Sequence, residues 1–556
     1  MPEQADPARD APEIFRDRLF WLGLIAGGFF LVLTIWFNLG MDQSTYAYGA
    51  WVWKNYHLPP YSGVWDLNYP GIFIIHWLAL ELFGESIQGF RIFDVLVQLN
   101  CLAMIFYLGR KLSGSSVAGC LSMILYGSYY FNLGLFNTGQ REGFIFWCWL
   151  WGLVLFSSGK NHPWLRAVPA GLVLGFAFLI KPFCGLAWLV FGGWFLRQEF
   201  KSGFKRAWFG LALFSFCCLL PAGLVILYYW RIGHILELYQ SLVLYNLELY
   251  SAQSIPWWGW PYFTFFSIIR ENPLILLGAI LVIFIGLRSA TRTQAPLLWI
   301  LILMAVASLI AYVLQGKFYA YQRIPLLGFL AVFAGAGWAG VGAKIRSAFK
   351  GRKGMIFSGL FYGVMTLAAV VAIRPALRSF ALKYAFRDLD SAYSAWMNNP
   401  ADFHYSSNNY LAGKYLEALV GPEDGIEYFG PYPLALFMLK KKLPTRFPCP
   451  ELILFLPASG VMTDFQEKWI REYSADVIKA RPRFFLVSDV FPGQGQIFAH
   501  MASSGLKQAL RDQFPELQKF LLDNYKLIAR EGVIEIYELK GPGNLGRRNL
   551  PAPGSP

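Results

Sequence analysis

The sequence predicts a polytopic α-helical membrane protein with about eleven transmembrane helices and a C-terminal extracytoplasmic α/β domain. Three observations support this prediction: a very apolar composition, a series of long uncharged runs, and a change of composition near residue 374. Of the 556 residues, 56% are hydrophobic and only 15% are charged. A soluble protein with a single core does not have this composition at this length.

Long apolar runs supply the predicted spans, since a helix needs about 20 apolar residues to cross a bilayer. The uncharged runs of this length are 19–41, 112–140, 207–230, 293–316, 324–343 and 354–373. Shorter or interrupted candidates are 95–109, 143–159, 167–180, 182–196 and about 273–287. Residues 1–18 form a polar N-terminal tail, and the run after them is too long for a signal peptide. The first run is therefore expected to remain as a membrane anchor of a transmembrane domain at 19–373.

The basic residues predict the orientation. The formal net charge is +14, and Lys and Arg concentrate in short connections at 110–111, 160–166, 197–206, 288–292 and 344–353. The positive-inside rule places these loops and the N-terminus in the cytoplasm. Alternation then leaves outside the first loop, 38–94, together with 137–142, residue 181, 231–272, 315–323 and everything after 373. This topology requires 70–84 to lie in the membrane interface.

Other uses of the positive charge are not indicated. No solvated stripe of Lys and Arg with interleaved aromatic residues is present, so nucleic-acid binding is not expected. Contact with anionic membrane lipids accounts for the charge. Six of the seven cysteines fall in predicted spans, Cys449 is the only one in the outer domain, and the six histidines are scattered. The sequence therefore predicts no metal site built from Cys and His.

From residue 374 the composition becomes that of a water-soluble α/β domain, which we expect to cover 374–540. Short apolar runs predict strands at 426–429, 452–456, 484–488 and 533–539. Helical patterns lie between them at 464–479 and 506–523. The tail 541–556 is rich in Gly, Pro and Asn and is expected to be disordered.

Polar groups gather at the outer ends of the predicted spans. They lie at Asp42, in the run 65–70 (WDLNYP), at 140–142 (QRE), at Lys181 and in the cluster 317–323. Ionisable groups next to a membrane are costly to keep, so their convergence on one side indicates a functional site.

These motifs together resemble the GT-C superfamily of membrane glycosyltransferases, most closely the branch of the protein O-mannosyltransferases and the lipid A aminoarabinose transferase. The resemblance covers roughly residues 18–345. It rests on the acid at Asp42 before an aromatic stretch, WDLNYPG at 65–71, GFR at 89–91, TGQRE at 138–142, GFAFLIKP at 175–182 and QGKFYAYQRIP at 315–325. The chain departs from the family at Asn68, where Lys is common, at Gln322, where the family has His, and at Gln43, where protein O-mannosyltransferases have a second acid.

The resemblance implies an inverting transfer of a sugar from a polyprenyl-phosphate donor to a hydroxyl of a glycan or glycolipid. No cofactor is expected, because the cationic residues already serve the leaving phosphate. Asp42 would act as the catalytic base. The cations expected to bind the donor phosphate are Lys181, Lys317, Arg323 and Arg141. The residues expected to contact substrates are Asp66, Asn68, Tyr69, Glu142, Tyr321 and Gln322.

Structural roles remain open for several of these residues. Asp42 could instead cap the following helix, and Lys181 could extend its ammonium group to the membrane interface. Glu142 and Asp66 could assist Asp42, bind a divalent cation with it, or form a salt bridge with Arg141 or Arg91. The aromatic run 245–260 favours an interfacial belt over a sugar-binding surface.

Two other functions compete with glycosyl transfer, and a polymerase or ligase that uses lipid-diphosphate glycans would share much of the pocket. A transporter or flippase of polyprenyl-linked glycans would share the apolar, basic composition, but it would place ionisable groups in mid-membrane and show paired repeats. A non-catalytic relative that only binds lipid-linked glycans would keep the pocket without turnover. The sequence identifies neither the sugar nor the acceptor.

Overall fold

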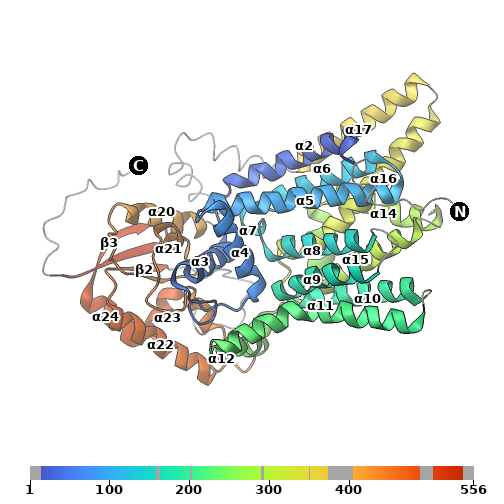
Figure 1. Ribbon diagram of the computed structural model, residues 1–556. Helices are drawn as coiled ribbons and strands as arrows, with labels where there is room; N and C mark the ends of the chain where they lie inside the picture. The colour runs from blue at the N-terminus through green and yellow to red at the C-terminus, as the bar shows by residue number, and fades with distance from the viewer. Residues whose placement is uncertain are drawn as a thin grey trace. The chain divides into compact units, whose positions relative to one another are not determined.

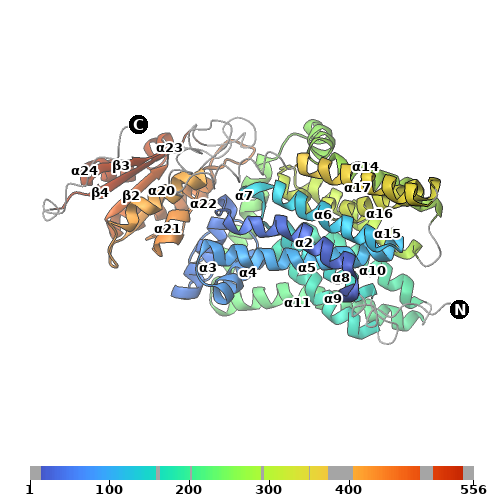
Figure 2. The same cartoon turned by 90° about the horizontal axis from the view of Figure 1, so that it is seen from above.

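The computed structural model describes residues 14–157, 163–200, 203–289, 294–349, 351–372, 405–488, 502 and 505–541. Most of the predicted N-terminal tail, the start of the outer domain and nearly all of the predicted disordered tail lie outside these residues. The chain divides into two compact units. The first is helical and the second is an α/β unit (Figures 1 and 2).

The helical unit contains residues 1–56, 67–246 and 254–392. Its first half consists of α2 (Arg18–Leu33), α3 (Met41–Tyr56), α4 (Pro70–Phe83), α5 (Ile87–Ser113), α6 (Ser116–Asn132), α7 (Gly134–Asn137), α8 (Arg141–Ser157) and α9 (Pro163–Ile180). Its second half consists of α10 (Leu186–Glu199), α11 (Phe204–Arg231), α12 (Ile235–Tyr239), α13 (Ser267–Glu271), α14 (Pro273–Ser289), α15 (Ala295–Leu314), α16 (Ile324–Ala348) and α17 (Arg352–Ala372). Short 3-10 turns include η2 (Pro182–Gly185) and η9 (Ala320–Arg323).

Helices α2, α5, α6 and α16 pack side by side (Figures 1 and 2). Small residues allow the close approach, because a Cβ atom on Gly127 would lie 2.3 Å from the carbonyl oxygen of Gly27. A second group is formed by α8, α9 and α11, again with glycines at the crossing. A Cβ atom on Gly175 would lie 2.3 Å from the carbonyl oxygen of Cys218. These contacts are typical of helices that associate in a membrane, where backbone proximity replaces the hydrophobic effect.

Among the described residues, five helices are long and apolar enough to cross a membrane, and a bent pair would make a sixth. The helices are Arg18–Trp36, Ile87–Ser113, Phe204–Arg231, Ala295–Leu314 and Ala320–Ala348, and the bent pair is Trp257–Ile269 with Pro273–Val282. A multi-pass membrane protein is therefore supported, whereas the count of eleven spans stays a prediction.

One predicted span has a different form. The run 112–140 does not make one long helix, because α6 ends at Asn132 and a short turn of helix, α7, follows. Gly134 has a φ of 71°, which glycine adopts at little cost and which turns the chain at this point. This break produces the turn that contains Thr138, Gly139 and Gln140 of the TGQRE motif, while Arg141 and Glu142 begin α8.

The α/β unit contains residues 57–66, 247–253 and 393–556. Its sheet has the strand order β1-β2-β4-β3, where β1 is Ile426–Phe429, β2 is Phe484–Ser488, β3 is Tyr525–Glu531 and β4 is Ile534–Leu539. Strands β1 and β2 are parallel, with Ile426 opposite Phe484, and the other pairings are antiparallel. The helices of this unit are α20 (Tyr405–Glu417), α21 (Leu434–Leu439), α22 (Asp464–Ala480), α23 (Leu506–Asp512) and α24 (Pro515–Asn524).

Two of the local predictions for this unit are wrong. The run 452–456 is not a strand but overlaps the 3-10 helix Pro450–Leu454, which begins with a proline that fixes a helical φ. Gln466 then donates to the carbonyls of Ile453 and Phe455, at 2.6 and 2.7 Å, which occupies groups that a strand would pair. The helical pattern 506–523 is broken into α23 and α24 at Pro515, and β3 follows it without having been predicted.

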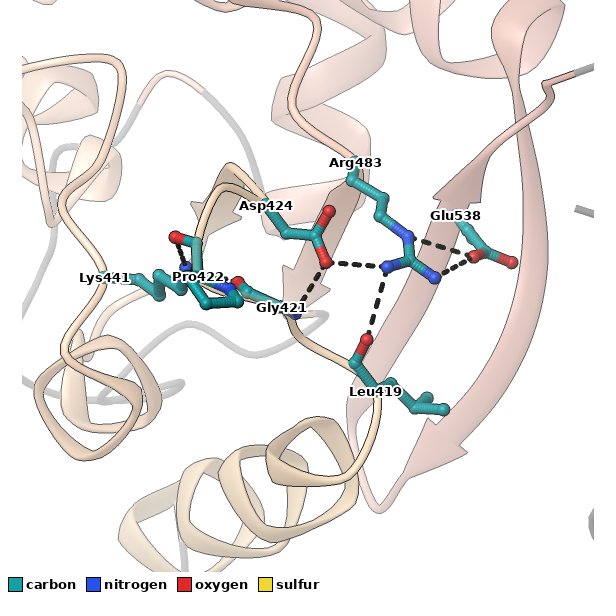
Figure 3. Close-up of polar contacts among 7 residues, drawn as sticks. All are labelled: Leu419, Gly421, Pro422, Asp424, Lys441, Arg483 and Glu538. Atoms are coloured by element: carbon teal, nitrogen blue, oxygen red, sulfur yellow. Dashed lines mark hydrogen bonds and ion pairs between the residues drawn. The ribbon is translucent and has the colours of Figure 1, made fainter. Parts of the chain in front are cut away.

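Arg483 connects three segments of the sheet (Figure 3). It precedes β2 and donates to Asp424 Oδ2 at 2.6 Å, before β1, and to Glu538 Oε1 at 3.1 Å, in β4. It also donates to the carbonyl oxygen of Leu419 at 3.3 Å. Asp424 in turn accepts from the backbone amide of Gly421 at 2.6 Å. The guanidinium group therefore stabilises the end of the sheet at which β1 and β2 begin.

The first predicted outer loop contributes a segment to the α/β unit. Trp65 is fully buried there, with its ring centroid 5.0 Å from that of Trp469, and its amide donates to the carbonyl of Arg446 at 2.6 Å. Arg446 also donates to the carbonyl of Tyr61 at 3.0 Å. The ten residues 57–66 thus belong to a unit whose remaining chain lies mostly beyond residue 393, and Trp65 is buried in its core.

Candidate active site

Asp42 is the centre of a cluster of charged side chains in the helical unit. It is the second residue of α3 and is half-buried. Burial raises the pKa of its carboxyl group above the usual value, and the charge of Glu142 raises it further. Three influences lower this pKa: the charge of Arg141, a hydrogen bond with the Gln140 side chain, and the charge of Lys181. Asp42 therefore lies close enough to two cations and a second acid for their charges to act on it.

Local backbone structure brings these residues together. Gly139 has a φ of 69°, and α8 begins two residues later at Arg141, so that Arg141 and Glu142 occupy the first turn of a helix. Helix α9, which ends at Ile180, packs against α8. Lys181 interrupts the helix with φ −163° and ψ 123°, because a residue before proline avoids the helical region. The break leaves the Lys181 side chain beside the start of α8.

Lys181 forms a buried ion pair with Glu142. Its ammonium nitrogen lies 2.6 Å from Glu142 Oε1, and the two side chains are 12% and 4% exposed. Burial lowers the pKa of Lys181, and the charge of Glu142 opposes this shift. Lys181 is therefore not an isolated cation reaching for the membrane interface. Glu142 does form a salt bridge, as one alternative had it, but its partner is Lys181 and not Arg141 or Arg91.

Arg141 joins two more of the predicted residues to the site. Its guanidinium group donates to the side-chain oxygen of Asn68 and, at 3.1 Å, to the hydroxyl of Tyr321. The group also lies 5.9 Å from the ring centroids of both Tyr46 and Tyr321, which suits a cation–π contact. Because Arg141 is 7% exposed, these contacts hold a charge that is almost removed from water.

The loop after α15 presents Lys317 and Arg323. Gly316 and Phe318 both have positive φ values, 61° and 57°, so the backbone at Phe318 is strained. The ring of Phe318 is held by three aromatic neighbours, Trp260, Phe263 and Tyr312, with centroids 5.2 to 6.3 Å away. Trp260 therefore supports this loop, a role that the predicted interfacial belt did not include.

Both cations of this loop are buried. Lys317 is 3% exposed, and burial lowers its pKa to about 7. Arg323 is 2% exposed and lies 5.9 Å from the ring centroid of Tyr312. The 3-10 turn η9, which contains Tyr321 and Arg323, packs against α8.

The remaining predicted residues have other surroundings. Gln322 accepts a hydrogen bond from the amide of Tyr319 at 3.1 Å and so caps η9. Tyr69 donates from its hydroxyl to the carbonyl of Leu242 at 3.4 Å. Asp66 is buried in the α/β unit, where burial raises the pKa of Glu451 and the charge of Asp66 raises it further. The cluster around Asp42 thus contains Arg141, Glu142 and Lys181, with Asn68 and Tyr321 attached through Arg141.

Two residues that contact the cluster around Asp42 were not predicted as site residues. Gln140 belongs to the TGQRE motif but was given no role, and Tyr46 was assigned only to an aromatic stretch. Their positions in sequence were the available signal, since Gln140 precedes Arg141 and Tyr46 follows Asp42 by one helical turn. In the parts of the chain that the structure describes, no group of three or more His, Cys, Asp or Glu side chains is arranged to hold a metal ion.

The comparisons with known proteins are consistent with the predicted resemblance to the GT-C superfamily of membrane glycosyltransferases. A family model described as dolichyl-phosphate-mannose-protein mannosyltransferase matches residues 68–226, which include Asn68, Arg141, Glu142 and Lys181. No curated protein sequence matches the chain.

Among solved structures, ArnT from Cupriavidus metallidurans bound to undecaprenyl phosphate has the same fold, with a TM-score of 0.52 at 13% identity over 93% of this chain and 97% of that one. The apo state of the same protein matches with a TM-score of 0.49 at 15% identity, over 91% and 95% of the two chains. The oligosaccharyltransferase AglB from Archaeoglobus fulgidus, in complex with an inhibitory peptide and a dolichol-phosphate, matches with a TM-score of 0.48 at 12% identity, over 84% and 69%.

Proposed function

We propose that this protein is an inverting glycosyltransferase that moves a sugar from a polyprenyl-phosphate donor to a hydroxyl group of an envelope glycan, a glycolipid or a lipid A-type acceptor. The observation that carries the proposal is the cluster of Asp42, Arg141 and Lys181, in which a carboxylate and two cations act on one another. The family model and the ArnT fold support the same class of donor, because ArnT was solved with undecaprenyl phosphate.

The cluster can perform the transfer in one step. Asp42 takes the proton of the acceptor hydroxyl as its oxygen forms a bond to the anomeric carbon. The bond from that carbon to the phosphate oxygen breaks on the opposite face, and the phosphate keeps the electron pair. Burial raises the pKa of Asp42, which makes the carboxylate a stronger base than an exposed aspartate.

Cations at the site stabilise the leaving phosphate. Arg141 is oriented by Asn68 and Tyr321, and a guanidinium group can bind phosphate through two parallel hydrogen bonds. Lys181 is already neutralised by Glu142, so it would share its charge between this acid and the phosphate. Lys317 and Arg323 are proposed to complete the phosphate site, and Asp66, Tyr69 and Gln322 are kept as proposed substrate contacts.

We place the reaction at the outer face of the cytoplasmic membrane, with the N-terminus inside and the α/β unit outside. The positive-inside pattern of the connecting loops supports this topology. The α/β unit is proposed to help select the acceptor. Mass spectrometry of envelope glycans and lipids from cells with and without the intact protein would identify the acceptor and the sugar.

A direct assay distinguishes transfer from the two competing functions. Purified protein in liposomes receives radiolabelled polyprenyl-phosphate sugar and a mixture of envelope acceptors. Label on the acceptor supports the transferase. Movement of the lipid-linked sugar across the bilayer without transfer would instead support a flippase, and donor binding without turnover for any acceptor would support a non-catalytic binding protein.

We expect transfer to proceed without a divalent cation, because basic residues already provide positive charge for a monophosphate leaving group. Incubation with EDTA followed by dialysis should change the rate by less than about twofold. A loss of more than about tenfold, restored by Mg²⁺ or Mn²⁺, would contradict this expectation, since a metal that stabilises the leaving group contributes several kcal/mol.

The pKa of Lys317 gives a pH-dependent prediction for donor binding. Because this pKa is lowered to about 7 by burial, Lys317 is charged below that pH and loses its charge as the pH rises through it. Wild-type affinity for undecaprenyl phosphate should therefore fall by about 10- to 100-fold between pH 6 and pH 9, relative to Lys317→Arg, which stays charged. Comparison with this variant cancels the ionisation of the lipid phosphate itself. Parallel curves for the two proteins would exclude Lys317 from the phosphate site.

A further inference from the structure

The residue after the proposed base, Gln43, has contacts that the proposed reaction does not use. It is fully buried in the first turn of α3. Its side-chain nitrogen Nε2 lies 2.7 Å from the carbonyl oxygen of Thr138, 3.2 Å from that of Phe136 and 3.3 Å from that of Leu135. All three neighbours are acceptors, so the donating end of the amide must face them.

These carbonyls belong to the turn that leads into the active site. The turn contains α7 and Thr138, and it continues through Gly139 to Gln140, Arg141 and Glu142. The same turn is also held by Arg91, which is fully buried and donates to Leu135 O at 3.1 Å and to Thr138 O at 3.0 Å. Arg91 also donates to Thr138 Oγ1 and to the carbonyl of Asn38.

The space between Gly40, Gln43 and Phe136 is narrow. A Cβ atom on Gly40 would lie 2.5 Å from Gln43 Oε1 and 3.0 Å from the Cα atom of Phe136. Glycine at position 40 therefore permits the amide to reach the turn. Since Asp42 and Gln43 are consecutive in α3, the hydrogen bonds of Gln43 tie the base to the segment that carries Arg141 and Glu142.

We propose that Gln43 is a positioning residue that fixes Arg141 and Glu142 relative to Asp42 by binding the carbonyls of Leu135, Phe136 and Thr138. The expected effect on donor binding rests on the proposed function. It also gives a physical reason why a second acid does not fit at this position. A carboxylate at 43 has no hydrogen to donate and would face three carbonyl oxygens, which repel it.

The test uses the full-length protein in detergent or nanodiscs with Gln43→Glu, which preserves the shape of the side chain. The ionised glutamate repels the turn at pH 8, whereas the protonated form can donate one hydrogen bond near pH 5. Gln43→Met removes the donor without adding charge. Gln88→Glu is the matched control, because Gln88 is exposed in the first turn of α5.

The first readout is amide hydrogen exchange of the segment 134–142, expressed as a ratio to wild type at the same pH. For Gln43→Glu we expect about 10- to 100-fold faster exchange at pH 8, from the loss of a buried hydrogen bond, and a ratio close to one near pH 5. Gln43→Met should exchange faster at both pH values, and Gln88→Glu should match wild type. An exchange ratio close to one near pH 5 also shows that the Gln43→Glu variant is folded.

The second readout is the affinity for undecaprenyl phosphate, which should weaken by a similar factor at pH 8 in Gln43→Glu and recover at the lower pH relative to wild type. Exchange in Gln43→Glu equal to that of wild type at pH 8 would overturn the proposal, and so would altered exchange with unchanged affinity. If wild type itself does not bind this lipid, the proposed function fails, and the exchange ratios alone decide whether Gln43 positions the turn.

Discussion

Replacement of Asp42 by asparagine is expected to reduce sugar transfer by about 10²- to 10⁴-fold, the range for loss of a general base. Asparagine has nearly the same shape and can keep the hydrogen bond to Gln140, but it cannot accept the proton of the acceptor hydroxyl. Donor binding should change by less than about tenfold, because the cations remain. The measurement is the initial rate of transfer from labelled donor, with donor affinity determined in parallel.

The control for this variant is Asp523→Asn, the same chemical change at an exposed position of α24. It should have the wild-type rate. Transfer in Asp42→Asn within about tenfold of wild type would remove Asp42 from the catalytic role and would favour the alternative in which it only caps α3.

The second large effect is expected for Arg141→Gln. The variant loses a buried cation whose partners are Asn68 and Tyr321, and truncation of such a group typically costs 2–5 kcal/mol. The value of kcat/KM for the donor should therefore fall by roughly 30- to 5,000-fold. Arg231→Gln, at an exposed position at the end of α11, should leave it unchanged.

The same variant should change the pH dependence. Burial raises the pKa of Asp42, and Arg141 is the largest influence that lowers it. Asp42 must be ionised to act as a base, so activity is lost as the pH falls through its pKa. Without Arg141 this pKa is higher, and the acid limb of the pH–rate profile should move to higher pH. Arg141→Lys keeps a positive charge and should show a smaller shift. An unchanged acid limb in Arg141→Gln would mean that Asp42 is not the titrating base.

Several parts of the molecule follow from local sequence. Four of the six long uncharged runs coincide with helices that are long and apolar enough to cross a membrane, because the bilayer demands internally bonded backbone over a fixed length. Strands β1 and β2 coincide with two short apolar runs, since an apolar strand of this length is covered on both faces. Proline and glycine mark the breaks at Lys181 and Gly134 through their own backbone preferences.

Local sequence does not predict which residues the site residues contact. Glu142 and Lys181 are 39 residues apart and Arg141 and Asn68 are 73 apart, so their pairing depends on how α8 packs against α9 and the loop before α4. The charge of Lys181 carries no information in the sequence about a distant counter-charge. In the same way, the amide of Gln43 carries none about the carbonyl groups that it contacts.

The sequence by itself determined the class of protein, the set of polar residues at helix ends and the candidate base, because composition, hydrophobic run length and local motifs are properties of neighbouring residues. Only the tertiary structure decided which charges are paired, that Gln322 caps a turn, and that residues 57–66 belong to the α/β unit. These facts arise from long-range packing, which fixes the distance and burial on which every electrostatic interaction depends.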